Sequence, residues 1–135
     1  MNDIIADTNA IIWYLADPVR LTAPAAAIMH RAVASGRLFV TSISLVEMTY
    51  LVEKSRLDPI VLSKLWSAIR DPLEPVEVLP LTADVASVIF RIPRPAVPDM
   101  PDRIITATAL AHSLPLVTSD GKIRAVSLPG LTVIW

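Results

Sequence analysis

The sequence predicts one α/β domain over residues 1–135, with helices on both faces of a central parallel sheet of about five strands. Three observations support this three-layer fold class. The length of 135 residues is that of a single domain. The content of 53% hydrophobic and 19% charged residues is enough to form a substantial core. Apolar segments of strand length alternate with helical segments, as in parallel sheets built from right-handed crossovers.

Each element of the N-terminal half has a local signal. The first apolar segment is short and reads as a buried strand. The helix after this strand ends before Pro18, and Gly36 is a natural C-terminal stop for the next helix. Ser42 is placed to cap a third helix, and Asp58 with Pro59 begins a fourth. The expected strands are therefore 4–6 and 38–41, and the expected helices are 9–16, 24–36, 42–54 and 59–70.

The C-terminal half continues the same alternation. Thr82 is placed to cap a helix after the third strand. The segment 93–101 holds four prolines in nine residues and reads as a stiff surface loop. Small residues dominate the helix that follows this loop. The expected strands are 76–79, 116–118 and 131–134, and the expected helices are 82–92 and 102–113.

Composition excludes several classes of function. The chain has no cysteine, which removes disulfides, thiol catalysis and cysteine-ligated zinc. Its three glycines stand too far apart for a phosphate-binding loop, and His30 and His112 have no metal-ligand spacing. The longest stretch without a charged residue, 104–119, is too short to span a bilayer, and the first residues do not resemble a signal peptide. We therefore expect a soluble, cytoplasmic protein whose chemistry rests on carboxylates.

Four acidic residues fall where ligands of open parallel sheets bind, beyond the carboxyl ends of the strands. Asp7 directly follows one predicted strand and Asp120 comes just after another, while Glu47 and Asp102 lie in the first turns of predicted helices. Each aspartate taken alone has a simpler reading, because Asp7 and Asp102 are placed to cap helices and Asp120 precedes a glycine in a turn signature. Glu47 differs, since it projects from a largely apolar helix face.

Taken together, the four acids favour a metal site. Carboxylates that converge on one edge repel one another unless a cation neutralises them. Mg²⁺ takes oxygen ligands and keeps waters for a phosphate substrate, so such a site can activate water against a phosphodiester. With four of the 13 acidic residues placed there, the rest of the surface would carry 12 basic and 9 acidic residues. The pattern therefore predicts a metal-dependent phosphodiesterase.

Four segments resemble the signature segments of PIN-domain ribonucleases, and most closely those of VapC-type toxins from bacterial type II toxin–antitoxin pairs. They occur in the family's order and span nearly the whole chain. They read Ile-Ile-Ala-Asp-Thr-Asn at 4–9, Ser-Leu-Val-Glu at 44–47, Asp-Arg-Ile-Ile-Thr-Ala-Thr-Ala at 102–109 and Leu-Val-Thr-Ser-Asp at 116–120.

The resemblance implies a PIN-like fold and cleavage of RNA that depends on Mg²⁺ or Mn²⁺. By position, it implies that Asp7, Glu47, Asp102 and Asp120 are the catalytic and metal-binding quartet. Thr118 matches the hydroxyl residue that supports the site. Asp99 matches a further family acid, but Pro101 is displaced by one residue from the family's pattern, which leaves open whether Asp99 is a ligand or an outer-shell group.

The resemblance also implies a homodimer and a cognate VapB-type antitoxin whose tail fills a groove near the site. Trp13, Tyr14, Tyr50, Leu51 and the loop 93–101 are candidates for its lining, although each residue also suits an ordinary apolar position.

Three basic residues flank members of the quartet and are candidates for phosphate contacts with RNA, with a solvated surface charge as the alternative for each. They are Arg103, Lys122 and Arg124.

Three competing interpretations remain. One is a PIN nuclease that acts in RNA processing outside toxin–antitoxin systems, or on DNA flaps. Another is an inactive PIN module that binds proteins, although the intact quartet argues against that. A phosphate-accepting receiver domain would need an aspartate after the third strand, where Leu79 is followed by Pro80 and Leu81.

Overall fold

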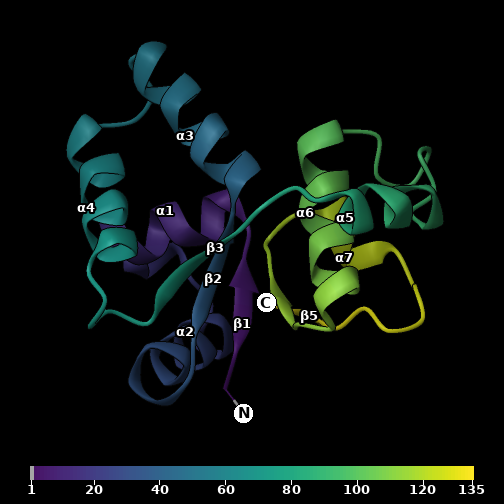
Figure 1. The fold of residues 1–135 in the computed structure, drawn as a ribbon, viewed down its shortest axis with the longest axis horizontal. Helices are drawn as coiled ribbons and strands as arrows, with labels where there is room; N and C mark the ends of the chain where they lie inside the picture. Colours follow the sequence, from purple (N-terminus) through teal and green to yellow (C-terminus); the bar gives the residue numbers. More distant parts are fainter. Residues whose placement is uncertain (1) are drawn as a thin grey trace.

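The computed structural model describes residues 2–135 and has the predicted five-stranded parallel sheet, in the order β3-β2-β1-β4-β5 (Figure 1). Within this part of the chain the elements are β1 (Ile4–Ala6), α1 (Thr8–Ala16), the 3₁₀ turn η1 (Pro18–Arg20), α2 (Ala23–Ser35), β2 (Leu38–Thr41), α3 (Ser42–Glu53), α4 (Pro59–Arg70), β3 (Val76–Leu79), α5 (Ala83–Val88), the 3₁₀ turn η2 (Ile89–Arg91), α6 (Met100–His112), β4 (Leu116–Val117), α7 (Gly121–Ala125) and β5 (Val133–Ile134).

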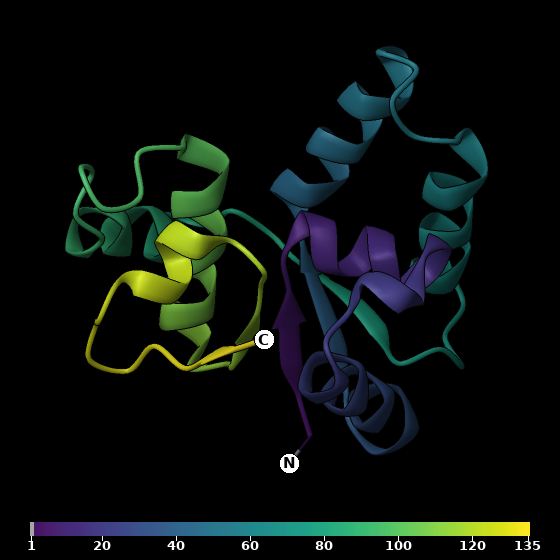
Figure 2. The ribbon, with the colours of Figure 1, turned by 180° about the vertical axis from the view of Figure 1, so that it is seen from behind.

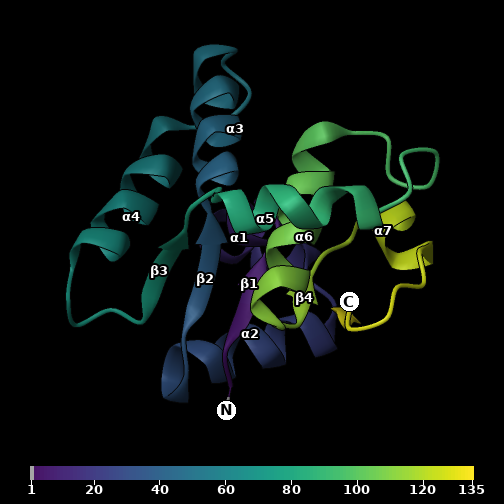
Figure 3. The same cartoon turned by 45° about the vertical axis from the view of Figure 1, so that its right-hand side comes forward.

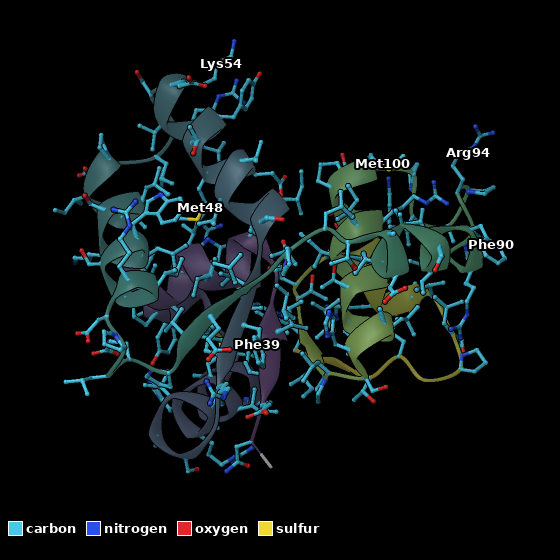
Figure 4. All side chains as sticks on the ribbon, in the orientation of Figure 1. Phe39, Met48, Lys54, Phe90, Arg94 and Met100 are labelled. Carbon is cyan, nitrogen blue, oxygen red and sulfur yellow. The ribbon has the colours of Figure 1, made fainter. Side chains whose placement is uncertain are left out.

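Helices cover both faces of the sheet because its strands are apolar on both sides. Ile4 and Ala6 of β1 pack with α1 to α4, while Ile5 between them packs with α5, α6 and α7. This alternation is the two-residue period of a strand. Figures 1 and 2 show α5, α6 and α7 on one side of the sheet, opposite α1, α2 and α4. Met48 of α3, labelled in Figure 4, is fully buried in the first of these two cores.

Several boundaries differ from the predictions for local reasons. Thr41, and not Ser42, caps α3, since its hydroxyl accepts the Ser44 N–H. Asp99, and not Asp102, caps α6, so that helix begins at Met100. The helix capped by Thr82 ends at Val88 and continues as η2, and strands β4 and β5 are shorter than expected.

The proline-rich loop is only partly a surface loop. Val97 is fully buried within the core beneath α5 and α6, which anchors the segment to the domain. Arg94, on the other hand, is exposed and extends outward in Figure 4. The loop therefore enters α6 from a fixed direction.

Chain direction brings the relevant helices to one edge of the sheet. All strands run parallel, so their carboxyl ends share that edge. Helix α3 leaves β2 there, and α3 also contacts α6 across the edge. Figure 3 shows α3 above the end of β2, with α6 beginning beside it and running down along the sheet. No helix between residues 2 and 135 has the length and apolar character needed to cross a bilayer.

Candidate active site

The four predicted acids line one cavity of about 220 Å³ at this edge. Its remaining lining residues are Thr8, Asn9 and Leu51. Asp7 comes from the end of β1, Glu47 from α3, Asp102 from the first turn of α6, and Asp120 from the segment between β4 and α7. The fold therefore brings together acids that lie up to 113 positions apart in the sequence.

Asp7 is both a helix cap and a wall of the cavity. Its side chain is 6% exposed; Oδ1 accepts the Ala10 N–H at 2.7 Å, and Oδ2 accepts the Thr118 hydroxyl. Burial, with smaller contributions from the charges of Asp120 and Glu47, raises the pKa of Asp7 to about 6, although these two hydrogen bonds act to lower it. Capping and a role in the site are therefore compatible in this residue.

Thr118 joins two of the acids. Besides donating its hydroxyl hydrogen to Asp7, Thr118 Oγ1 accepts the Asp120 N–H at 3.0 Å. The residue is fully buried at the end of β4. This position fixes the Asp7 carboxylate against the chain that carries Asp120.

Glu47 is oriented by hydroxyl groups that the sequence analysis did not identify. Its Oε1 accepts the Thr8 hydroxyl at 2.6 Å, and Thr8 Oγ1 lies 2.9 Å from Ser44 Oγ. Ser44 Oγ in turn lies 3.1 Å from Thr41 Oγ1. Partial burial raises the pKa of Glu47, the Thr8 hydrogen bond opposes this, and the Asp99 charge adds to it. In the sequence, the one indication of these hydroxyl groups is Ser44, which precedes Glu47 by three residues and so shares its helix face.

Asp99 and Asp102 have different roles in α6. The Asp99 carboxylate accepts the Asp102 N–H at 3.1 Å as the N-cap, whereas Asp102 is the residue that lines the cavity. Partial burial and then the charges of Asp120, Asp99, Glu47 and Asp7 raise the pKa of Asp102 to about 7. Asp99 therefore stands beside the quartet and acts on it through its charge.

The three basic residues lie in two different settings. Arg103 donates from Nη2 to the carbonyl oxygens of Ile89 and Ile92, at 3.1 and 3.0 Å, and does not line the acidic cavity. This guanidinium therefore ties α6 to η2. Lys122 and Arg124 are exposed on α7, the helix that Asp120 caps by accepting the Lys122 and Ile123 N–H groups.

The donor set fits a hard divalent cation, because every charged group around the cavity offers carboxylate oxygen. Among residues 2–135, however, no three His, Asp or Glu side chains are already arranged to hold a metal ion together. The absence of a closer arrangement of these side chains agrees with mutual repulsion among four like charges. The cavity suits a cation that binds few carboxylates directly and keeps part of its water shell, as Mg²⁺ does.

The raised pKa values predict how pH affects stability without metal. The pKa of Asp7 and Asp102 is 3.8 in an ordinary setting but about 6 and about 7 here, so the folded state binds these protons more tightly than the unfolded state. These two carboxyl groups therefore add most to the free energy of unfolding below about pH 4, and this contribution is lost as the pH rises through 6 and 7. We expect the Tm in chelator to fall from pH 5 to pH 7.5, and Mn²⁺ to raise it at pH 7.5 by binding the folded state.

The control is the double variant Asp7→Asn, Asp102→Asn, measured by thermal denaturation in the same buffers. Its Tm should fall less over this pH range and respond less to Mn²⁺. A parent chain and a double variant with the same pH and Mn²⁺ responses would contradict the assignment of these shifts to the cavity.

A second prediction concerns Glu47→Gln. Glutamine can still accept the Thr8 hydroxyl, while the partly buried charge is removed, so the free energy of unfolding in chelator should stay the same or rise slightly. Cleavage of RNA should fall at the same time. Chemical denaturation and a cleavage assay on one preparation measure both effects. Severe destabilisation with unchanged metal binding would instead indicate a structural ion pair.

Comparison with known proteins gives the same fold from independent directions. The family model for the PIN domain matches residues 4–128. Ribonuclease VapC22 of Mycobacterium tuberculosis (strain ATCC 25618 / H37Rv) is 29% identical over 135 residues, which cover 100% of both chains.

Solved structures agree on the fold. VapBC2 from Rickettsia felis, bound to a DNA fragment from its promoter, has a TM-score of 0.72 at 19% identity, covering 97% of this chain and 96% of that one. DNA-bound VapBC from Salmonella typhimurium has a TM-score of 0.71 at 21% identity, covering 98% and 97%. At these identities the likeness concerns the fold.

Proposed function

The chain belongs to the PIN-domain family, and from this premise we propose that it is a metal-dependent endoribonuclease that acts as the toxin of a type II toxin–antitoxin pair. The observation that carries the proposal is the convergence of Asp7, Glu47, Asp102 and Asp120 on one cavity. The likeness to Ribonuclease VapC22 along both entire chains supports RNA as the substrate.

The quartet would hold Mg²⁺ or Mn²⁺, and Thr118, Thr8 and Asp99 would support it. The bound cation would supply charge neutralisation at the phosphate and a water of lowered pKa. The chain's own groups set the geometry: Thr118 fixes Asp7, Thr8 fixes Glu47, and Asp99 holds the first turn of α6. This orientation keeps the Asp7 and Glu47 oxygens in place while phosphodiester and water exchange in the cavity.

Phosphates of the RNA would be contacted from α7. Lys122 and Arg124 are exposed there, within about one turn after Asp120, so their side chains would contact an RNA strand that enters the cavity. Arg103, which was predicted for the same role, is engaged with the carbonyl oxygens of Ile89 and Ile92. We therefore assign the phosphate contacts to Lys122 and Arg124 and a structural role to Arg103.

An antitoxin segment would occupy the apolar groove of about 440 Å³ beside the cavity, lined by Ile43, Val46, Glu47, Tyr50, Leu51 and Pro101. Glu47 and Leu51 line both spaces, so an occupant of the groove would obstruct the cavity. The likeness of this fold to that of the two VapBC structures supports such a partner. The lining of this groove by Tyr50, Leu51 and Pro101 supports the role proposed for these residues. Trp13 and Tyr14 contact Trp135 and His30 instead. We further propose that the active form is a homodimer.

Induced expression tests the proposal in cells. The chain is expressed alone, with the small open reading frame next to its gene, and as Asp7→Asn. Growth arrest with RNA cleavage should occur only for the unmodified chain expressed alone. RNA cleavage by the purified chain without growth arrest would favour a PIN nuclease of RNA processing. If the folded, metal-loaded protein caused neither growth arrest nor RNA cleavage, the result would favour an inactive binding module.

A further inference from the structure

Two tryptophans and an arginine form a surface cluster beside the acidic cavity. The ring centroids of Trp13 and Trp135 lie 5.7 Å apart with planes at 53°. The guanidinium carbon of Arg20 lies 4.3 Å from the centroid of the Trp13 ring. We call these three residues the α1 cluster, because α1 carries Trp13 and leads into η1, which ends at Arg20.

The α1 cluster faces solvent. Trp135 packs against the core on the α1 side, whereas Trp13 is half-buried and Arg20 is exposed. The guanidinium that covers Trp13 therefore has its other face and its N–H donors available to a ligand. Contact with the ring also limits the orientations of Arg20, so less freedom is lost when a ligand binds.

One helical turn and one pair of hydrogen bonds connect the α1 cluster to the catalytic cavity. Asn9 lines the cavity and precedes Trp13 by four residues, so the two share one face of α1 about one turn apart. On the other route, the carbonyl of Ile134, next to Trp135, accepts the Thr118 N–H at 3.2 Å, and Thr118 donates to Asp7. The cluster thus adjoins the cavity from both α1 and β5.

The negative charge of the cavity explains why the α1 cluster could be needed for substrate binding. Four carboxylates around the cavity repel a polyanion, so a nucleic acid must gain its binding energy from groups at the edge of the cavity. Aromatic rings and guanidinium planes stack on unpaired bases, and guanidinium N–H groups also bind phosphate. The α1 cluster combines these groups, and its Trp13 lies one helical turn from Asn9, which lines the cavity.

We propose that the α1 cluster binds an unpaired nucleotide of the RNA next to the cleaved phosphodiester, with its base on the Arg20 and Trp13 planes. The inference rests on the proposed function and extends it by naming residues outside the acidic cavity that bind the substrate. It predicts that the cluster contributes to substrate binding and leaves the chemical step unchanged.

Binding is measured first, in the inactive Asp7→Asn background, with a labelled single-stranded RNA of about ten nucleotides in fluorescence anisotropy. Arg20→Ala and Trp13→Leu should each raise the Kd about tenfold, since stacking on one base is worth this much or more. Arg70→Ala is the matched control, because Arg70 covers Trp66 on α4 with a ring distance of 4.8 Å and does not line the cavity. It should leave the Kd within about twofold.

Cleavage by the chain with Asp7 intact separates this inference from the proposed function. Arg20→Ala should raise the KM for single-stranded RNA with kcat nearly unchanged, whereas a parent chain that cleaves no RNA would refute the proposed function itself. Kd and KM values of Arg20→Ala equal to those of Arg70→Ala would overturn the inference. So would a loss of self-association in Trp13→Leu, seen by light scattering, with RNA binding by Arg20→Ala unchanged, because the surface would then join copies of the chain.

Discussion

Replacing Asp7 with asparagine should lower RNA cleavage by orders of magnitude while the domain stays folded. Asparagine keeps a side-chain oxygen that can accept the Ala10 N–H, so the cap of α1 is largely retained. It removes one of four negative charges around the cavity, and with it a metal-binding oxygen of full charge. Initial cleavage rates at saturating Mn²⁺, with folding followed by circular dichroism, measure the effect.

Asp58→Asn provides the matched control for Asp7→Asn. Asp58 caps α4 through the Ile60 N–H at 3.0 Å, and it does not line the cavity. The same substitution there should leave cleavage at the parent rate. Equal cleavage by Asp7→Asn and Asp58→Asn would return Asp7 to a purely capping role.

The second large effect is expected at Asp102. Asp102→Asn should abolish cleavage, because this side chain lines the cavity and the charges of the other three cavity acids all raise its pKa. Asp99→Asn should weaken cleavage by about tenfold to a hundredfold at most, as for an outer-shell group, because its carboxylate is engaged with the Asp102 N–H.

The two variants are compared at saturating Mn²⁺ after their unfolding curves have been matched. Because asparagine also caps helices, α6 should keep its first turn in Asp99→Asn. Normal cleavage by Asp102→Asn together with an inactive Asp99→Asn would mean that the two roles are exchanged and that the family segment is aligned wrongly here.

The sequence was sufficient to predict the sheet and the position of the quartet. Strand identity came from apolar runs that end at polar residues, and parallel pairing followed from the helices between them. The resemblance to PIN-domain proteins is confirmed by the family match over residues 4–128. Asp7 shows why single-residue reasoning was ambiguous, since it does cap α1 and also lines the cavity.

Choices between adjacent capping residues could not be predicted. Thr41 and Ser42 are both good caps, and the chain uses Thr41 because its hydroxyl also reaches the buried Ser44. At α6, Pro101 suits either the first turn of a helix that starts at Met100 or the position just before a helix that starts at Asp102, and the structure has the earlier start.

Contacts between side chains far apart in the sequence could not be predicted either. The Thr8 hydroxyl meets Glu47 across 39 positions, and only the parallel register of β1 and β2 brings them together. Arg103 was assigned from its place beside Asp102, but its side chain turns toward η2. The pairing of Trp13 with Trp135 likewise depends on β5 lying at the edge of the sheet.

Cleavage of RNA by the purified chain after exhaustive removal of metal tests the central claim most directly. Clustered carboxylates without a neutralising cation are unfavourable, and they cannot activate water as a bound divalent ion does. Cleavage should be absent in chelator and should return with Mg²⁺ or Mn²⁺, but not in Asp7→Asn. Full cleavage by the metal-free chain would contradict the account.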